Sequence, residues 1–136
     1  VTEDIRTNEI SILASKYAGI ELVRNVLREM QKRLVKNKNY VTEGRDMGTY
    51  VFPEADYKFY LDADPIVRAN RRTLQLTETL GMKFKTEKIL DEINQRDTLD
   101  KTRKICPLHP ADDAIIIDTT DLSVNDVVNN VIERIG

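Results

Sequence analysis

The stretch YKFYLDADP, residues 57–65, decides the fold of this chain. Its first five residues are rich in aromatic side chains, which predicts a strand over residues 57–61. Asp64 followed by Pro65 is typical of a helix start, because aspartate accepts hydrogen bonds from the first N–H groups and proline fits the first turn. The stretch therefore predicts a strand that leads directly into a helix, which we expect to end at Leu80, before Gly81.

A second strand and helix are predicted nearer the C-terminus. Residues 114–117, AIII, form a continuous apolar run, which predicts a strand buried on both faces. Ser123 with Asp126 three residues later resembles a capping box and opens the last helix, whose valines and isoleucines form one apolar stripe. Strands that alternate with helices pair in parallel, so we expect an α/β fold with a parallel sheet flanked by helices.

The rest of the chain predicts three more helices and one more strand. The expected helices are residues 7–17 with Thr7 as cap, residues 21–34 with an apolar stripe, and residues 86–103. A short strand is expected at residues 40–42, leading into EGRDMG at residues 43–48. Three strands are few for such a sheet, which suggests that further N-terminal strands belong to it.

Composition excludes several classes of protein. The chain has 136 residues, of which 32% are charged, and a net charge of −2, which indicates one soluble domain without the positive charge that drives binding to nucleic acid or to anionic membranes. No apolar run approaches the roughly 18 residues of a membrane span. One cysteine and one histidine exclude an internal disulfide and a multi-His/Cys metal site. We therefore expect a cytoplasmic protein with no nucleic-acid partner, no membrane partner and no protein-bound metal.

One face of the helix expected over residues 86–103 is apolar at its start and charged towards its end. Steps of four, three, four and three residues place Ile89, Ile93, Arg96, Asp100 and Arg103 on that face. Charged groups that continue a core-facing stripe are costly to bury unless they line a wet cleft or hold an anionic ligand. The alternative is a solvent-exposed ladder of salt bridges.

Two more clusters combine arginine with the end of an element. Three arginines within one helical turn repel one another unless an anion neutralises them, although ordinary surface arginines remain an alternative; these are Arg68, Arg71 and Arg72. Within GRDMG, Arg45 can bind phosphate through a bidentate fork and Asp46 can accept hydrogen bonds, and a plain turn is the alternative. Holding phosphate is the use that all three clusters share. With five glycines, neither of the common glycine-rich phosphate-loop patterns is present.

These motifs together resemble the bacterial cytidylate kinases, which transfer the terminal phosphate of ATP to CMP or dCMP. The resemblance rests on EGRDMGT at residues 43–49 with VFP at 51–53, on Asp62-Ala63 before the three arginines, and on Arg96-Asp97 through Asp100 to Arg103. It covers nearly the whole chain in order. It implies a parallel sheet like that of P-loop nucleoside-monophosphate kinases, with CMP, dCMP and ATP as small-molecule partners and Mg²⁺ as a cofactor.

The resemblance also implies a role for each cluster. The residues around the cytosine would be Ser15, Arg24 and Asp46. The residues on the CMP phosphate would be Arg45 and Arg103, and those on the sugar hydroxyls Asp100 and Arg96. The lid over the ATP phosphates would contain Arg68, Arg71 and Arg72. Arg71 and Arg45 are the expected catalytic residues, and Mg²⁺ would be held mainly by the P-loop part and the nucleotide.

The family's phosphate-binding loop and early strands precede the region that Val1 matches. We therefore expect this chain to be the C-terminal portion of a cytidylate kinase that by itself transfers phosphate slowly or not at all, the full enzyme being a monomer. The expected regions are residues 1–38 (helical part of the monophosphate-binding region), 39–66 (core strands and nucleotide-site loop), 67–85 (lid) and 86–136 (C-terminal helix, strand and final helix). The alternatives are a non-catalytic nucleotide-binding module and an interaction domain for an acidic partner or RNA.

Overall fold

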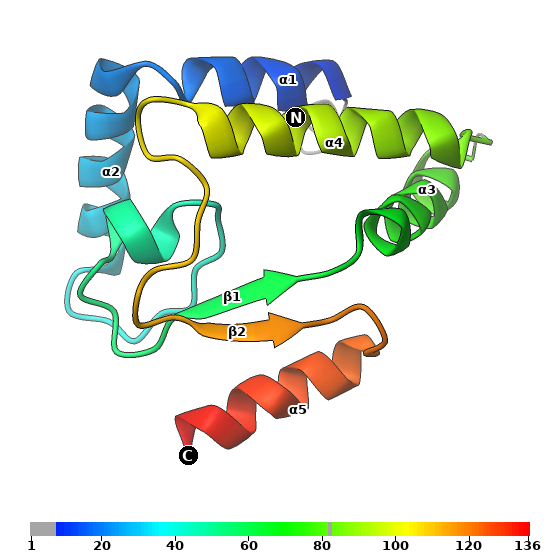
Figure 1. Cartoon of the computed structure of the whole chain (residues 1–136). Helices are drawn as coiled ribbons and strands as arrows, with labels where there is room; N and C mark the ends of the chain where they lie inside the picture. Colours follow the sequence, from blue (N-terminus) through cyan, green and yellow to red (C-terminus); the bar gives the residue numbers. More distant parts are fainter. Residues whose placement is uncertain (1–7, 82) are drawn as a thin grey trace. The chain divides into compact units, whose positions relative to one another are not determined.

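The computed structural model describes residues 8–81 and 83–136, apart from the side chains of Asn8, Glu9, Ser11 and Ser15 (Figure 1). The chain divides into two compact units. The first contains the residues up to Glu54 together with Arg96–His109, and the second contains Ala55–Gln95 together with Pro110–Gly136. The four regions expected from the sequence stay a prediction.

The second unit contains a parallel sheet. Strands β1 (Phe59–Asp62) and β2 (Ile115–Asp118) pair side by side, with Phe59 opposite Ile115 (Figure 1). This pairing confirms the predicted α/β class with a parallel sheet. The strand expected at residues 40–42 is wrong: this segment is irregular, and the side chain of Val41 is fully exposed. A strand needs a neighbour for its backbone groups, and the described residues pair none with it.

Local sequence signals set the ends of the helices in the second unit. Helix α3 (Pro65–Leu80) begins where the Asp64 carboxylate accepts a hydrogen bond from the N–H of Ile66. It ends at Gly81, whose φ of 66° is the left-handed conformation that glycine adopts without strain. Helix α5 (Val124–Ile135) opens with the predicted capping box of Ser123 and Asp126. Both helix starts therefore confirm the predictions.

Burial of β2 differs from the expectation. Ile117 is 5% exposed, but Ile116 is 62% exposed, so the strand is not buried on both faces. Successive residues of a strand point to opposite faces of the sheet. Ile117 is therefore covered by other described residues, whereas Ile116 on the opposite face of the sheet is open to solvent.

The first unit is mainly helical. It contains α1 (Asn8–Tyr17), α2 (Glu21–Val35), the single π-helical turn η2 (Met47–Val51) and the last turns of α4 (Thr86–Thr102). Val51 and Phe52 are buried, and the ring of Tyr40 lies 5.1 Å from that of Phe52. The expected cap Thr7 lies outside the described residues. The sequence did not predict η2.

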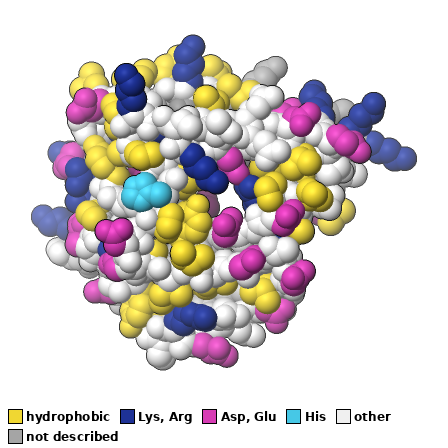
Figure 2. Space-filling model, viewed as in Figure 1, with side chains coloured by type: hydrophobic (Ala, Val, Ile, Leu, Met, Phe, Trp, Pro, Cys, Tyr) yellow, Lys and Arg dark blue, Asp and Glu magenta, His cyan; other side chains and the backbone are white. Residues whose placement is uncertain are grey.

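The apolar stripe predicted for α2 is largely left open by the described residues. Val23 is half-buried, but Met30 and Leu34 are 55% and 73% exposed, and Arg24 is the buried residue of this helix. Figure 2 shows other apolar side chains lying open to solvent among charged ones. In the part of the chain that the structure describes, no helix combines the length and the apolar character that crossing a membrane requires.

Candidate functional site

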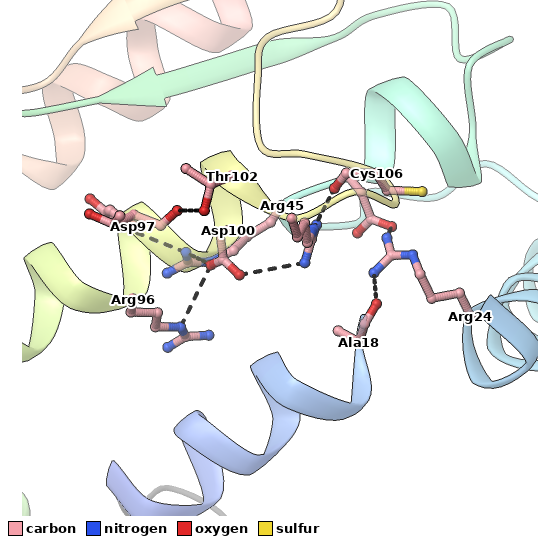
Figure 3. Close-up of polar contacts among 11 residues, drawn as sticks. Ala18, Arg24, Arg45, Arg96, Asp97, Asp100, Thr102 and Cys106 are labelled. Carbon is pink, nitrogen blue, oxygen red and sulfur yellow. Dashed lines mark hydrogen bonds and ion pairs between the residues drawn. The ribbon is translucent and has the colours of Figure 1, made fainter. Parts of the chain in front are cut away.

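A cluster of charged side chains in the first unit surrounds Asp100, which is 1% exposed (Figure 3). The Nη1 of Arg45 donates to one carboxylate oxygen, and the Nη1 of Arg103 lies 3.5 Å from the other. The Nε of Arg96 lies 3.9 Å from the oxygen that Arg45 contacts. Helical spacing brings Arg96 and Asp100 to one face of α4, as predicted, and Arg103 directly after this helix reaches the same carboxylate. The burial of Asp100 excludes the fully solvent-exposed ladder.

Among the described residues, the cluster contains more arginines than carboxylates. The Nη1 of Arg45 also lies 3.6 Å from Asp97, so within the described residues three guanidinium groups face two carboxylates. The Nη2 of Arg103 is buried and has no hydrogen-bond partner among the described residues. Buried donors in folded proteins are almost always paired. A charged donor without a partner, in a cluster with more arginines than carboxylates, is suited to an anionic ligand.

The turn after α4 holds Arg103 in place. Its Nε donates to the carbonyl of Cys106, whose φ of 49° bends the chain back. The N–H of Leu108 donates to the carbonyl of Asp100 at 2.8 Å. Burial lowers the pKa of the Arg103 guanidinium from its ordinary value, and the nearby charge of Arg24 lowers it further. Arginine nevertheless stays protonated in proteins at neutral pH, so the group remains a cation.

A second ion pair lies beside this cluster. Arg24, which is 7% exposed, donates through Nη2 to Asp46 and through Nη1 to the carbonyl of Ala18 at 2.8 Å (Figure 3). Asp46 directly precedes η2, and the charges of both Arg24 and Asp46 act on Arg103. The base-binding and phosphate-binding residues implied by the resemblance are therefore neighbours in one unit. Ser15 belongs to α1, and its side chain lies outside the described residues.

The three arginines assigned to a lid lie on α3, in the second unit. Arg68 donates to the carbonyl of Ala63 at 3.1 Å, and Arg72 donates to Gln75 at 2.8 Å. The Nη2 of Arg71 donates to three carbonyl oxygens after β2: those of Thr119 at 2.7 Å, Leu122 at 3.2 Å and Thr120 at 3.3 Å. Arg71 therefore holds this loop in the structure. The lid role of all three arginines stays a prediction.

Two residues near the site were given no role in the sequence analysis. Asp97 contributes a second carboxylate to Arg45, and its position directly after Arg96 is the only local signal for it. Tyr50 lies in η2 against the guanidinium groups of Arg24 and Arg28, and no periodicity pointed to this contact. Among residues 8–81 and 83–136, no group of three His, Cys, Asp or Glu side chains is arranged to hold a metal ion.

Comparison with known proteins shows the family of this chain. A family model described as cytidylate kinase matches residues 1–136. The chain belongs to the cytidylate kinase family. It is 47% identical over 138 residues to the cytidylate kinase of Oleidesulfovibrio alaskensis, covering 99% of this chain and 61% of that protein. It is 44% identical to the cytidylate kinase of Thermosipho melanesiensis, covering 98% of this chain and 61% of that protein. It is 42% identical to the cytidylate kinase of Nitratidesulfovibrio vulgaris strain Hildenborough, covering 99% of this chain and 58% of that protein.

These comparisons confirm the family resemblance drawn from the motifs. The chain spans about three fifths of the length of these cytidylate kinases and matches their C-terminal portion. The names of the relatives describe kinases, which are transferases.

Proposed function

We propose that the protein serves ATP-dependent phosphorylation of CMP or dCMP, with the cluster around Asp100 as the monophosphate site. The observation that carries this proposal is the buried Nη2 of Arg103, which has no partner among the described residues, within a cluster that contains more arginines than carboxylates. The family membership and the names of the relatives support it. The proposed setting is the cytoplasm, with a monomeric full-length enzyme.

The phosphate of CMP would bind Arg45 and Arg103. Arg45 now donates to Asp100, and a dianionic phosphate is a stronger acceptor for that guanidinium than a carboxylate shared among several arginines. An Asp100 carboxylate released in this way can accept hydrogen bonds from both sugar hydroxyls, with Arg96 beside it. The same aspartate thus has two roles, first with Arg45 and then with the sugar.

The base would bind beside Arg24 and Asp46, with Ser15 as a third group. Cytosine has an exocyclic amino group that can donate to the Asp46 carboxylate, whereas uracil has a carbonyl oxygen at the same position. Uracil would therefore leave the carboxylate unpaired against another acceptor. A site built from such polar partners rejects the wrong base more strongly than an apolar pocket does.

The ATP side of the reaction is proposed on the resemblance alone. Arg68 and Arg72 would contact the ATP phosphates, and Arg71 and Arg45 would act on the phosphoryl group in transfer, which needs mainly positioning and charge neutralisation. On the same resemblance, we assign Mg²⁺ mainly to the P-loop part and the nucleotide. The 136 residues contain no glycine-rich phosphate loop, and we expect these residues alone to transfer phosphate slowly or not at all.

Nucleotide binding tests the proposal without requiring turnover. Titration calorimetry should show that the protein binds CMP more tightly than UMP or AMP. Arg103→Met should weaken CMP binding by about 10- to 100-fold, because a hydrogen bond from a charged donor contributes about 1.5–3 kcal/mol. Arg134→Met is the matched control, since the hydrogen bonds of Arg134 within the described part of the chain go to Asn130 of its own helix α5.

Two outcomes would contradict the proposal. Equal affinity for CMP, UMP and AMP would remove the assignment of the substrate, and an unchanged CMP affinity in Arg103→Met would remove the assignment of the site. A turnover assay with ATP, Mg²⁺ and CMP tests whether these residues alone catalyse phosphoryl transfer. Robust turnover by these residues alone would show a phosphate site that neither motif nor geometry identified.

A further inference from the structure

We propose that Tyr50 is a positioning residue that orients the Arg24–Asp46 pair and thereby increases discrimination between cytosine and uracil. This inference rests on the proposed function, in which the Arg24–Asp46 pair contacts the base. Tyr50 lies outside the set of residues that the resemblance assigns to the nucleotide.

Tyr50 is held against one turn of α2 by three side chains. The guanidinium carbon of Arg28 lies 4.7 Å from the centre of the Tyr50 ring, and that of Arg24 lies 5.4 Å from it. Its hydroxyl donates to the side-chain oxygen of Asn25 at 2.5 Å. The ring is therefore fixed in position by the helix that carries Arg24.

Tyr50 also connects directly to Asp46. Its backbone N–H donates to the Asp46 carbonyl at 2.9 Å, in the first turn of η2. One residue thus contacts both members of the pair, Asp46 through its backbone and Arg24 through its ring. The backbone contact survives any substitution by a non-proline residue, whereas the ring contact depends on an aromatic side chain.

Arg24 gains a different kind of contact from this ring, because the N–H groups of a guanidinium lie in its plane and hydrogen bonds therefore meet its edge. Its Nη groups donate to Ala18 and Asp46, but its Nε is buried and has no hydrogen-bond acceptor among the described residues. A cation above an aromatic face is attracted to the ring. The Tyr50 ring therefore supplies the contact to the flat face of the guanidinium that the hydrogen bonds do not supply.

The orientation of Arg24 matters for the choice of base because its Nη2 holds the carboxylate of Asp46. A carboxylate held in one direction meets the amino group of cytosine well and meets the carbonyl of uracil badly. A carboxylate that is free to turn loses part of its attraction to the amino group of cytosine. It also avoids part of its repulsion from the carbonyl oxygen of uracil. Loss of the ring should therefore weaken CMP binding more than UMP binding.

Three variants separate positioning from a general structural effect. Tyr50→Phe keeps the ring and loses the hydrogen bond to Asn25, and Tyr50→Leu loses both. Tyr40→Leu is the matched control, because it removes an aromatic ring from the same unit, where Tyr40 packs on Phe52. Calorimetry with CMP and UMP then gives a ratio of affinities for each variant.

In Tyr50→Leu we expect the CMP affinity to fall about tenfold and the UMP affinity to fall less than about threefold. Tyr50→Phe should restore the ratio of affinities to within about threefold of that of the unsubstituted protein, and Tyr40→Leu should leave the ratio unchanged. An equal loss for CMP and UMP in Tyr50→Leu would overturn the inference, because a merely structural role lowers both affinities together.

A measurement without nucleotide keeps this inference distinct from the proposed function. With ¹⁵N-labelled arginine, restrained rotation of the Arg24 guanidinium gives separate Nη signals. These signals should persist in Tyr50→Phe and merge in Tyr50→Leu. If the unsubstituted protein binds no CMP, the proposed function fails and the signals still decide whether Tyr50 positions Arg24. Separate signals in Tyr50→Leu would overturn the positioning role.

Discussion

The carboxylate of Asp100 is buried and pairs with the guanidinium groups of Arg45 and Arg103, which come from two segments of the chain. Burial of an isolated carboxylate is very costly, and ion pairing offsets this cost only when the geometry is good. Arg45 and Arg103 supply that pairing from either side. The stability of the first unit therefore depends on the same charges that the proposed function assigns to substrate binding.

Replacement of Asp100 by asparagine should destabilise the protein and make it respond to phosphate. We expect Asp100→Asn to lower the free energy of unfolding by about 3–5 kcal/mol, because the guanidinium groups lose their buried counter-charge. Inorganic phosphate should then raise the melting temperature of this variant more than that of the unsubstituted protein. Thermal unfolding with and without phosphate measures both effects.

Asp113→Asn is the control for this experiment, because Asp113 pairs with Lys58 at an exposed position in the other unit. The account of the cluster is wrong if phosphate stabilises Asp100→Asn and Asp113→Asn to the same extent.

The sequence predicted part of this site. The helical period placed Arg96, Asp100 and Arg103 on one face, since that relation is local. The contact between Arg45 and Asp100 joins residues 55 positions apart, and no local pattern encodes it. The same applies to Tyr50, whose partners lie on α2. Long-range contacts depend on how helices and turns pack, which periodicity does not describe.

At the scale of elements, side-chain caps define where helices begin. Asp64 before α3 and Ser123 before α5 accept hydrogen bonds from backbone N–H groups of the first turn. These caps involve residues two or three positions apart, and the sequence therefore predicted both helix starts. The strand expected at residues 40–42 failed because a strand forms only with a partner, which lies elsewhere in the chain.

The capping box of α5 predicts a stability that falls in acid. Hydrogen bonds from Ser123, the side-chain bond first and the backbone bond second, hold the pKa of Asp126 below its ordinary value of 3.8. A carboxyl whose pKa is lower in the folded state stabilises that state at pH values above 3.8. This contribution is lost as the pH falls through the lower, folded-state pKa.

Ser123→Ala should therefore raise the pKa of Asp126 toward 3.8 and flatten the dependence of stability on pH below that value. Carbon NMR titration of the Asp126 carboxyl measures the first effect, and urea unfolding at several acidic pH values measures the second. Identical titration curves for Asp126 in both proteins would show that Ser123 is not the cause of the shift.

At the scale of the whole molecule, apolar side chains remain open to solvent on several elements. Val128 and Ile132 of α5 are 48% and 59% exposed, and Met30 and Leu34 of the stripe on α2 are 55% and 73% exposed. Contiguous apolar surface of this kind marks an interface or promotes association. The described residues therefore leave more apolar surface open than the helical patterns predicted.

The protein should consequently bind a hydrophobic dye such as ANS and should associate at high concentration. The double variant Val128→Lys, Ile132→Lys should lower both dye fluorescence and association. The paired change Asn125→Lys, Asn129→Lys adds the same charge to the same helix without removing apolar surface, and it should leave the dye fluorescence nearly unchanged. Equal effects of the two double variants would indicate that charge, and not apolar surface, governs the behaviour.

The fold class and the family could be predicted from the sequence because both follow from the order of motifs along the chain. The number of strands could not, since three were expected and the described residues form a sheet of two. Pairing of strands depends on contacts between distant segments, and the irregular segment at residues 40–42 shows how a local β pattern misleads when that contact is missing.

The guanidinium of Arg71 stabilises the turn that follows β2, because it donates hydrogen bonds to the carbonyl oxygens of Thr119, Thr120 and Leu122. A phosphate that attracts Arg71 must compete with these backbone acceptors. If Arg71 binds a phosphate as proposed, it has to give up hydrogen bonds to these carbonyl oxygens, and the turn between β2 and α5 loses the side chain that holds it.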